Sequence, residues 1–185
     1  MLMIRLILSK ENGAMGSFRF GDPDTDLRYA VNITLGNGND SEAALMAACA
    51  LLNGANPDII VDEMMGYTAL AASTVSGGVE TMRVLLQNNA DPNISSTYYG
   101  TPLTHHLWQI FEPVKPELVK LLLDHGARPD IPNREGKTAL DYARERDMPE
   151  IAQMCEDFLR GEKTQRVAAR GHRQNALRRY LRRPK

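Results

Sequence analysis

One short phrase occurs three times in this chain, and it constrains the fold more than any other feature. In each copy a leucine pair ends an apolar helical pattern. A glycine or asparagine follows, residues that tolerate the left-handed conformation at a helix end, and then alanine, a polar residue, proline, Asp or Asn, and isoleucine. The copies read LLNGANPDI at 51–59, LLQNNADPNI at 85–94 and LLDHGARPDI at 122–131. A helix end therefore recurs at intervals of 35 and 37 residues, measured between Ala55, Ala90 and Ala127.

A second phrase follows each copy and has the character of a helix start. Its threonine is a natural N-cap, because the hydroxyl oxygen accepts a hydrogen bond from a free amide of the first turn. The phrase reads GYTALAAS at 66–73, GTPLTHHL at 100–107 and GKTALDYA at 136–143. The capping threonines lie 13, 11 and 11 residues after the preceding alanines, at Thr68, Thr101 and Thr138. Helix end, extended segment, turn and helix start therefore repeat as one unit.

A period near 33 residues combined with the pattern T-P-L-H-x-A is the signature of ankyrin repeats. At these residues the chain resembles the ankyrin-repeat family, with three concordant copies between about residues 25 and 159. The resemblance implies an all-α fold, a solenoid of about four helix–turn–helix repeats with projecting β-hairpin fingers. It also implies a protein-binding module that is not an enzyme, and it names no partner.

The repeats divide the chain into three parts. We expect an N-terminal extension at 1–24, an ankyrin-repeat domain at 25–160 and a basic C-terminal tail at 161–185. Within the domain we place repeats at about 25–58, 66–94, 99–131 and 136–160. The irregular first repeat leaves the number at three or four. Residues 1–20 are open to three interpretations: an extension with at most one strand at 2–8, a signal sequence, or a start-site artefact.

Caps and prolines predict individual helices inside the repeats. In the first repeat, LGNGND at 35–40 should separate two helices, with Ser41 as the N-cap of the second. In the third, two prolines within 113–116 forbid a continuous helix, so the inner helix should run through Trp108 and end near Phe111. The other expected helices are 68–76, 79–87 and 116–124, followed by a charged terminal repeat from 138 to about 160 that acts as a polar cap.

The formal net charge of −1 conceals two oppositely charged parts. Residues 160–185 carry ten Lys/Arg and one acidic residue, a net +9, whereas the rest carries 12 basic and 22 acidic residues, a net −10. Two cysteines, Cys49 and Cys155, lie in helical patterns. We interpret them as buried thiols of a reducing compartment, which favours the cytoplasm. No apolar run approaches the roughly 18 residues of a membrane span.

Six residues in the expected fingers and inner helices form a candidate partner-binding patch. Tryptophan, tyrosine and arginine dominate the energetic centres of protein interfaces, and an exposed methionine is an adaptable contact. The candidates are Met65, Tyr98, Tyr99, His105, Trp108 and Arg134. Three alternatives stay open: packing of Trp108 under the insertion at 110–116, contact of Tyr99 with the next finger, and coverage of Met65 by the N-terminal extension.

The sequence carries no motif that indicates catalysis or a metal site. It has no G-x-S-x-G, P-loop, H-E-x-x-H or paired-cysteine pattern. His105 and His106 are adjacent, and neighbours on a helix point about 100° apart, so they do not form a two-ligand face. His125 lies near the C-terminal end of a helix, where the carbonyl dipoles favour a positive charge. We therefore expect no enzyme activity, no cofactor and no metal.

The basic tail is a second candidate site. It is dense in arginines that attract phosphate groups, including Arg173, Arg178, Arg179, Arg182 and Arg183. Its possible partners are nucleic acid, an anionic membrane surface or an acidic protein, and a disordered solubilising tail is the remaining interpretation.

Two functions follow from these observations. The main hypothesis is a non-catalytic protein–protein interaction module, such as an adaptor, an inhibitor or immunity protein, or an effector, that binds through its concave finger and inner-helix surface. The alternative is nucleic-acid or anionic-surface binding through the tail, with the repeats as a scaffold.

Overall fold

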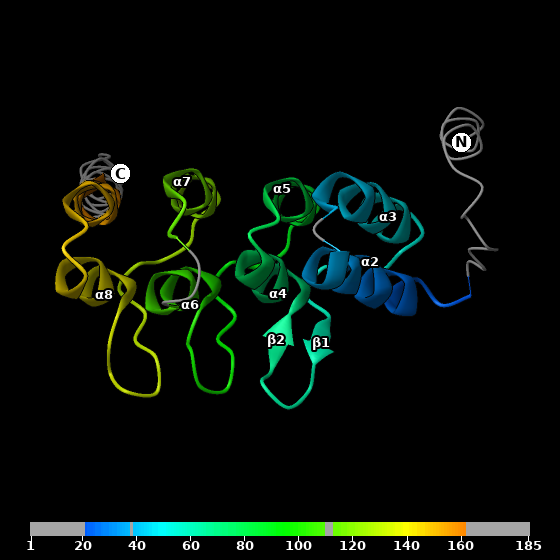
Figure 1. The fold of residues 1–185 in the computed structure, drawn as a ribbon, viewed down its shortest axis with the longest axis horizontal. Coiled ribbons are helices and arrows are strands. Elements are labelled where there is room, and N and C mark those ends of the chain that lie inside the picture. The colour runs from blue at the N-terminus through cyan, green and yellow to red at the C-terminus, as the bar shows by residue number, and fades with distance from the viewer. Residues whose placement is uncertain (1–20, 38, 110–112, 162–185) are drawn as a thin grey trace, which may run out of the picture.

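The computed structural model describes residues 21–37, 39–109 and 113–161. Its elements are α2 Pro23–Asn37, α3 Asp40–Leu52, β1 Ile60–Asp62, β2 Tyr67–Thr68, α4 Ala69–Ser76, α5 Val79–Gln87, α6 Pro102–Trp108, α7 Pro116–Asp124 and α8 Ala139–Glu145, and residues 149–161 are also helical. Helices α3, α5 and α7 form an outer row, and α2, α4, α6 and α8 form an inner row (Figure 1). Three loops project from the inner row. The expected solenoid of paired helices with projecting fingers is therefore confirmed.

The repeated helix end has the same hydrogen-bond geometry in all three copies. In each, the amide of the alanine donates to the carbonyl five residues earlier, which satisfies a free carbonyl at the end of the helix. The pairs are Ala55 to Ala50 at 3.0 Å, Ala90 to Leu85 at 3.1 Å and Ala127 to Leu122 at 2.9 Å. The phrase is therefore a structural unit as well as a sequence repeat.

The same bonds show that the leucine pair of the first copy is displaced by one residue. Ala50, rather than a leucine, takes the position of Leu85 and Leu122, and all three side chains are buried. The second leucine of that copy, Leu52, consequently falls on the outer surface and is 73% exposed. Matching the letters alone gives the wrong register for this copy.

The three threonines cap the inner helices as predicted. Each hydroxyl oxygen accepts a hydrogen bond from the amide three residues later. Thr68 accepts from Ala71 at 3.2 Å, Thr101 from Thr104 at 3.3 Å and Thr138 from Asp141 at 3.2 Å. In α8 the Asp141 carboxylate also accepts from the Thr138 amide, which completes a capping box. The expected helices at 79–87 and 116–124 have the predicted bounds.

The predicted start of the second helix is wrong. Asn39 rather than Ser41 is the N-cap of α3, and its side-chain oxygen accepts a hydrogen bond from the Glu42 amide at 3.3 Å. The linker is also shorter than the expected 35–40, because α2 continues to Asn37. Asparagine caps at least as well as serine, and the earlier start adds an acidic residue to the first turn, where the helix dipole favours it.

The predicted end of the third inner helix is also wrong. Helix α6 ends at Trp108, because Gln109 already has the extended angles φ −61° and ψ 135°. The guanidinium of Arg146 caps this helix end. It donates hydrogen bonds to the carbonyls of Leu107 and Gln109 at 2.9 and 2.8 Å. Phe111, where the helix was expected to end, lies outside the described residues.

Other polar side chains also cap a helix of a neighbouring repeat. The Asp40 carboxylate accepts from the amides of Glu80 and Thr81 at 2.7 and 3.0 Å, and so caps α5, which lacks a capping side chain of its own. The Lys115 ammonium donates to the Gly77 carbonyl, at the end of α4, over 3.1 Å. These bonds fix neighbouring repeats relative to one another.

A single apolar cluster runs through both rows, from Leu27 in α2 to Cys155 in the last helical segment. Both cysteines are free; Cys155 is buried, and burial raises the pKa of its thiol to about 11, whereas Cys49 is only half-buried. No helix in the described ranges has both the length and the apolar character that crossing a bilayer requires. The predicted strand at 2–8 and the five tail arginines lie outside those ranges, and the domain boundaries stay predictions.

Candidate functional site

The three projecting loops differ in how they are closed. We call them fingers one, two and three, comprising residues 59–68, 94–101 and 131–138. Finger one contains β1 and β2, which pair antiparallel. Finger two is closed by the Ser96 amide donating to the Gly100 carbonyl at 2.9 Å, and finger three by the Asn133 amide donating to Lys137 at 2.8 Å. Within the described residues, strands of a β-hairpin are thus found in finger one alone.

Side chains inside the fingers hold the tips in shape. In finger one, an oxygen of Asp62 accepts hydrogen bonds from the amides of Met64 and Met65 at 2.9 and 3.0 Å. In finger three, the side-chain oxygen of Asn133 accepts from two later amides, each at 3.0 Å. Short polar side chains of this kind satisfy turn amides that would otherwise need water.

Neighbouring fingers touch one another. The Thr97 amide of finger two donates to the Met65 carbonyl of finger one at 3.0 Å. On the other side, Gly100 has a φ of +78°, and a Cβ added there would lie only 2.9 Å from the Cβ of Asn133 in finger three. Glycine supplies both the left-handed backbone and the space for this approach. The three fingers therefore form a connected row.

Four rings from three elements stack beneath the fingers. Tyr67 of β2 lies 5.1 Å from His105 of α6 between ring centroids, and His105 lies 4.7 Å from Tyr99 of finger two. Tyr99 in turn lies 4.4 Å from Trp108 of α6. His105 and Trp108 are three residues apart on the helix and so share a face. We call these four residues the aromatic stack; such contacts add stability beyond the area they bury.

His105 is a buried support of the stack. It is 4% exposed, its Nε2 lies 3.4 Å from the Tyr67 hydroxyl, and its Nδ1 is buried without a partner among the described residues. Burial, together with the neighbouring His106, lowers the pKa of His105 to about 4. Burial also raises the pKa of Tyr67 to about 12. Both groups are therefore neutral at pH 7.

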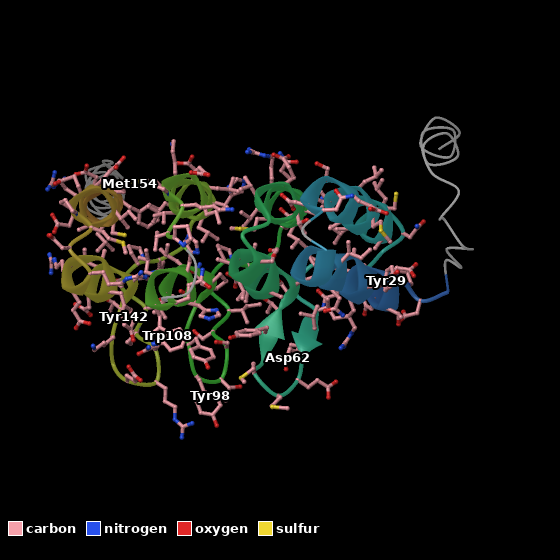
Figure 2. The ribbon with its side chains drawn as sticks, in the orientation of Figure 1. Tyr29, Asp62, Tyr98, Trp108, Tyr142 and Met154 are labelled. Carbon is pink, nitrogen blue, oxygen red and sulfur yellow. The ribbon has the colours of Figure 1, made fainter. Side chains whose placement is uncertain are left out.

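Tyr98 and Arg134 form the exposed rim above the stack. Figure 2 shows Tyr98 near the tip of finger two, with Trp108 closer to α6. The Arg134 guanidinium of finger three lies 5.0 Å from the centroid of the Tyr98 ring, in a cation–π contact. Between these side chains is a pocket of about 190 Å³, lined by Tyr98, Tyr99, Trp108, Asn133, Arg134 and Glu135.

His106 belongs to the helix packing on another side of α6. Its Nε2 accepts from the Lys115 amide at 3.1 Å, and its Nδ1 lies 3.2 Å from the Gln109 side-chain nitrogen. Burial lowers the pKa of His106 to about 4. His125, at the end of α7, places its Nδ1 2.9 Å from the Leu121 carbonyl. In the ranges that the structure covers, no three His, Cys, Asp or Glu side chains are grouped to hold a metal ion.

The comparisons with known proteins agree with the fold. The family model for the ankyrin repeat matches residues 65–97. The chain is 33% identical over 103 residues to the putative ankyrin repeat protein YahD of Escherichia coli K12, covering 54% of this chain and 51% of that protein. Its structure resembles an ankyrin repeat domain from Acinetobacter baumannii AYE, with a TM-score of 0.58, 24% identity, and 70% of this chain and 63% of that one covered. The chain contains an ankyrin repeat and has the ankyrin-repeat fold.

The chain also matches a small part of a much larger protein. The chain is 29% identical over 135 residues to the E3 ubiquitin-protein ligase hecd-1 of Caenorhabditis elegans, which uses 68% of this chain and only 5% of the ligase. It spans about half or less of the length of these relatives.

The structure brings four of the six candidate residues together: Tyr98, Tyr99, Trp108 and Arg134 all line the pocket. His105 lies beneath them, and Met65 is half-buried in finger one, where its carbonyl binds finger two. Their role in binding stays a prediction.

Sequence reasoning missed two residues of the site. Tyr67 belongs to the aromatic stack, and Asn133 holds finger three and lines the pocket. The available signal was their position, since Tyr67 directly precedes a capping threonine and Asn133 opens a finger turn.

Proposed function

We propose that this protein binds a partner protein through fingers two and three and the adjoining face of α6, without catalysing a reaction. Ankyrin repeats are generally protein–protein interaction modules. The observation that carries the proposal is the exposed pair Tyr98 and Arg134 placed over a packed aromatic stack. Tyrosine, tryptophan and arginine are the residues that most often dominate binding energy when they lie over a well-packed centre.

The rigidity of this surface supports the proposal. The fingers are connected laterally by the Thr97–Met65 hydrogen bond and by the close approach of Gly100 to Asn133. A surface that is ordered before binding loses less conformational entropy in the complex. An adaptor, an inhibitor or immunity protein, and an effector would each use such a surface in the same way.

The proposal assigns roles to the rest of the chain. We take residues 25–160 as the binding domain and 1–24 and 161–185 as flanking segments. The free cysteines, Cys49 and Cys155, support a reducing compartment such as the cytoplasm. The +9 charge of 160–185 is the basis of the competing hypothesis, in which the tail binds nucleic acid or an anionic surface.

Site-specific photo-crosslinking tests the binding surface. A photoreactive phenylalanine analogue replaces Tyr98 in one variant and Tyr29, on α2, in another; the two tyrosines are similarly exposed, at 49% and 56%. We expect proteins in the native lysate to crosslink from position 98 and not from position 29. Arg134→Ala, added to the position-98 variant, should weaken the crosslink, whereas Arg83→Ala on α5 should not.

The tail is tested in the same experiment. The position-98 crosslink should persist in a 1–160 truncation and after nuclease treatment, because the proposed contact lies on the fingers and not on the tail. A crosslink that disappears with the tail or with nuclease would transfer the function to residues 161–185. Equal crosslinking from positions 29 and 98 would reject the finger surface.

A further inference from the structure

We infer that the pocket between fingers two and three takes an acidic peptide segment of the partner. In this arrangement a carboxylate pairs with Arg134, and the apolar side chain beside it enters the pocket against Tyr99 and Trp108. The inference rests on the proposed function and specifies the chemistry of the partner at that site.

The size of the pocket suits one side chain. Its volume of about 190 Å³ is below the roughly 300 Å³ at which sites for whole small molecules begin. Tyr99 and Trp108 form an aromatic wall, with their ring centroids 4.4 Å apart. An apolar or aromatic side chain that replaces water there gains burial against rings already fixed by packing.

Arg134 differs from the other arginines of the last two repeats. Arg128, Arg144 and Arg160 pair with Asp130, Glu156 and Asp157 at 2.7–3.0 Å, and Arg146 binds two helix-end carbonyls. No acidic side chain of the described residues pairs with Arg134, whose contact is the face of the Tyr98 ring. Stacking leaves the guanidinium edge available, and its forked N–H groups match a carboxylate in two-point geometry.

The other polar groups of finger three are already engaged. The Glu135 carboxylate accepts a hydrogen bond from the Tyr142 hydroxyl at 3.2 Å. The Asn133 side chain uses its oxygen for two amides and its nitrogen for the same Tyr142 hydroxyl at 3.0 Å. Lys137 pairs with Glu145 at 2.8 Å. Arg134 is therefore the cation that finger three presents to a ligand.

The distribution of charge along the solenoid favours the same end. Residues 22–91 contain 2 basic and 10 acidic residues, a net −8, whereas residues 113–160 contain 8 basic and 10 acidic residues, a net −2. An acidic segment therefore meets less repulsion at finger three than at finger one, where Asp62 and Glu63 lie. Screening over about 8 Å at physiological salt confines the effect of finger one to its own surroundings.

A basic segment is the opposing possibility, since aromatic rings also attract cations. Arg134 already lies over the Tyr98 ring, so a second cation in the pocket would face like charge at close range. The aromatic wall therefore favours an uncharged apolar side chain. Arg134 favours a negative charge on the ligand residue beside it.

Four short peptides test the inference, and Trp108 reports on them because it is the single tryptophan of the chain and lines the pocket. The parent is the N-acetylated, C-amidated hexapeptide Gly-Ser-Phe-Asp-Ser-Gly. The three others replace Asp by Asn, Asp by Lys, or Phe by Ala. We expect the parent to change the emission of Trp108 in a saturable way. The Asn and Ala peptides should bind roughly tenfold more weakly and the Lys peptide more weakly still.

The variants separate charge recognition from general binding. Arg134→Ala should bind the Asp and Asn peptides equally, because the group that distinguishes them is gone, while Arg83→Ala should keep the tenfold preference. Tighter binding of the Lys peptide, a preference for Asp that survives Arg134→Ala, or no binding of any peptide would overturn the inference. A position-98 crosslink that persists alongside such a result would leave the proposed function standing, so the two failures are distinguishable.

Discussion

The outer row and the fingers use their side chains in opposite ways. In the outer row, Leu85 of α5 and Leu122 of α7 are 0% exposed and belong to one continuous apolar cluster. In the fingers, Met64 and Tyr98 are 80% and 49% exposed. The shape of the fingers comes instead from hydrogen bonds within turns, such as those accepted by Asp62. The buried side chains of the outer row thus stabilise the solenoid, whereas the fingers expose side chains that are available for contacts.

This separation predicts that stability and binding respond to different substitutions. Burial of apolar area is the main favourable term in folding, so truncating a buried side chain of the outer row should lower the free energy of unfolding while leaving the residues of the finger surface unchanged. Substitutions at the exposed rim should change binding and leave the unfolding transition in place. Helix α6 lies between the layers, because Leu103 and Leu107 join the apolar cluster while His105 joins the aromatic stack.

The largest expected effect is in the outer row. Leu122→Ala should lower the free energy of unfolding by about 2–5 kcal/mol, because it removes a fully buried side chain and leaves a cavity. Leu52→Ala is the matched control, and since Leu52 is largely exposed its cost should stay within about 0.5 kcal/mol. Urea unfolding followed by circular dichroism measures both. Equal costs for the two leucines would show that the one-residue displacement in the first repeat is not real.

The displacement also shows where sequence reasoning succeeded and where it failed. The bounds of α5 and α7 were predictable because each helix follows a clear start signal, Gly77-Gly78 and Pro116, and ends in the repeated phrase. In the first copy the leucine pair lies one residue closer to its alanine than in the other two, and the structure places Ala50 at the position five residues before Ala55. Two leucines look alike in a sequence, and only the distance back to the alanine separates the buried one from the exposed one.

The site was predictable residue by residue but not as an arrangement. Tyr98, Tyr99 and Trp108 follow from their places in a finger and an inner helix, and the structure brings them together. The burial of His105 did not follow, because it depends on Tyr67 and Tyr99 arriving from two different fingers. How close the fingers approach is set by contacts such as Gly100 with Asn133, between residues more than thirty positions apart, and a repeat pattern does not encode that spacing.

A second prediction concerns the helix between the layers. Burial is the first cause that lowers the pKa of both His105 and His106 to about 4, below the ordinary 6.5. Each ring is neutral in the folded protein and takes up a proton in the unfolded chain below about pH 6.5. Their contribution to stability is therefore present above pH 6.5 and is lost as the pH falls towards 4. A pKa lowered this far corresponds to roughly 3 kcal/mol for each ring.

His105→Phe isolates one ring, because it keeps an aromatic group in the stack and removes the titration. Unfolding free energies of this variant should fall less than those of the wild type between pH 6.5 and 4. Tyr67, which faces His105, has a raised pKa and stays neutral in this range, while Lys115, Arg146 and Glu117 surround His106 in both proteins. Asp141, whose pKa is lowered by its bonds to Thr138, loses its contribution only below this window. Identical pH profiles would mean that His105 does not carry the loss.

The smallest expected effect tests whether the fingers act as one row. Gly100 and Gly136 both have a φ of +78°, so alanine at either position meets the same left-handed strain of about 1–2 kcal/mol. A Cβ at position 136 meets nothing within 4 Å, whereas at position 100 it lies 2.9 Å from the Cβ of Asn133. Gly100→Ala should therefore cost about 1 kcal/mol more than Gly136→Ala in urea unfolding.

The difference between these two glycine variants measures the contact between fingers two and three. Gly100→Ala should also shift the emission of Trp108 and weaken the acidic-peptide response, since moving Asn133 displaces Arg134 from the Tyr98 ring. Gly136→Ala should leave both signals close to wild type. If the two variants behave alike, the fingers move independently. A rigid, pre-ordered surface would then no longer explain binding, and the contrast between a packed helix layer and a connected finger row would hold for the helices alone.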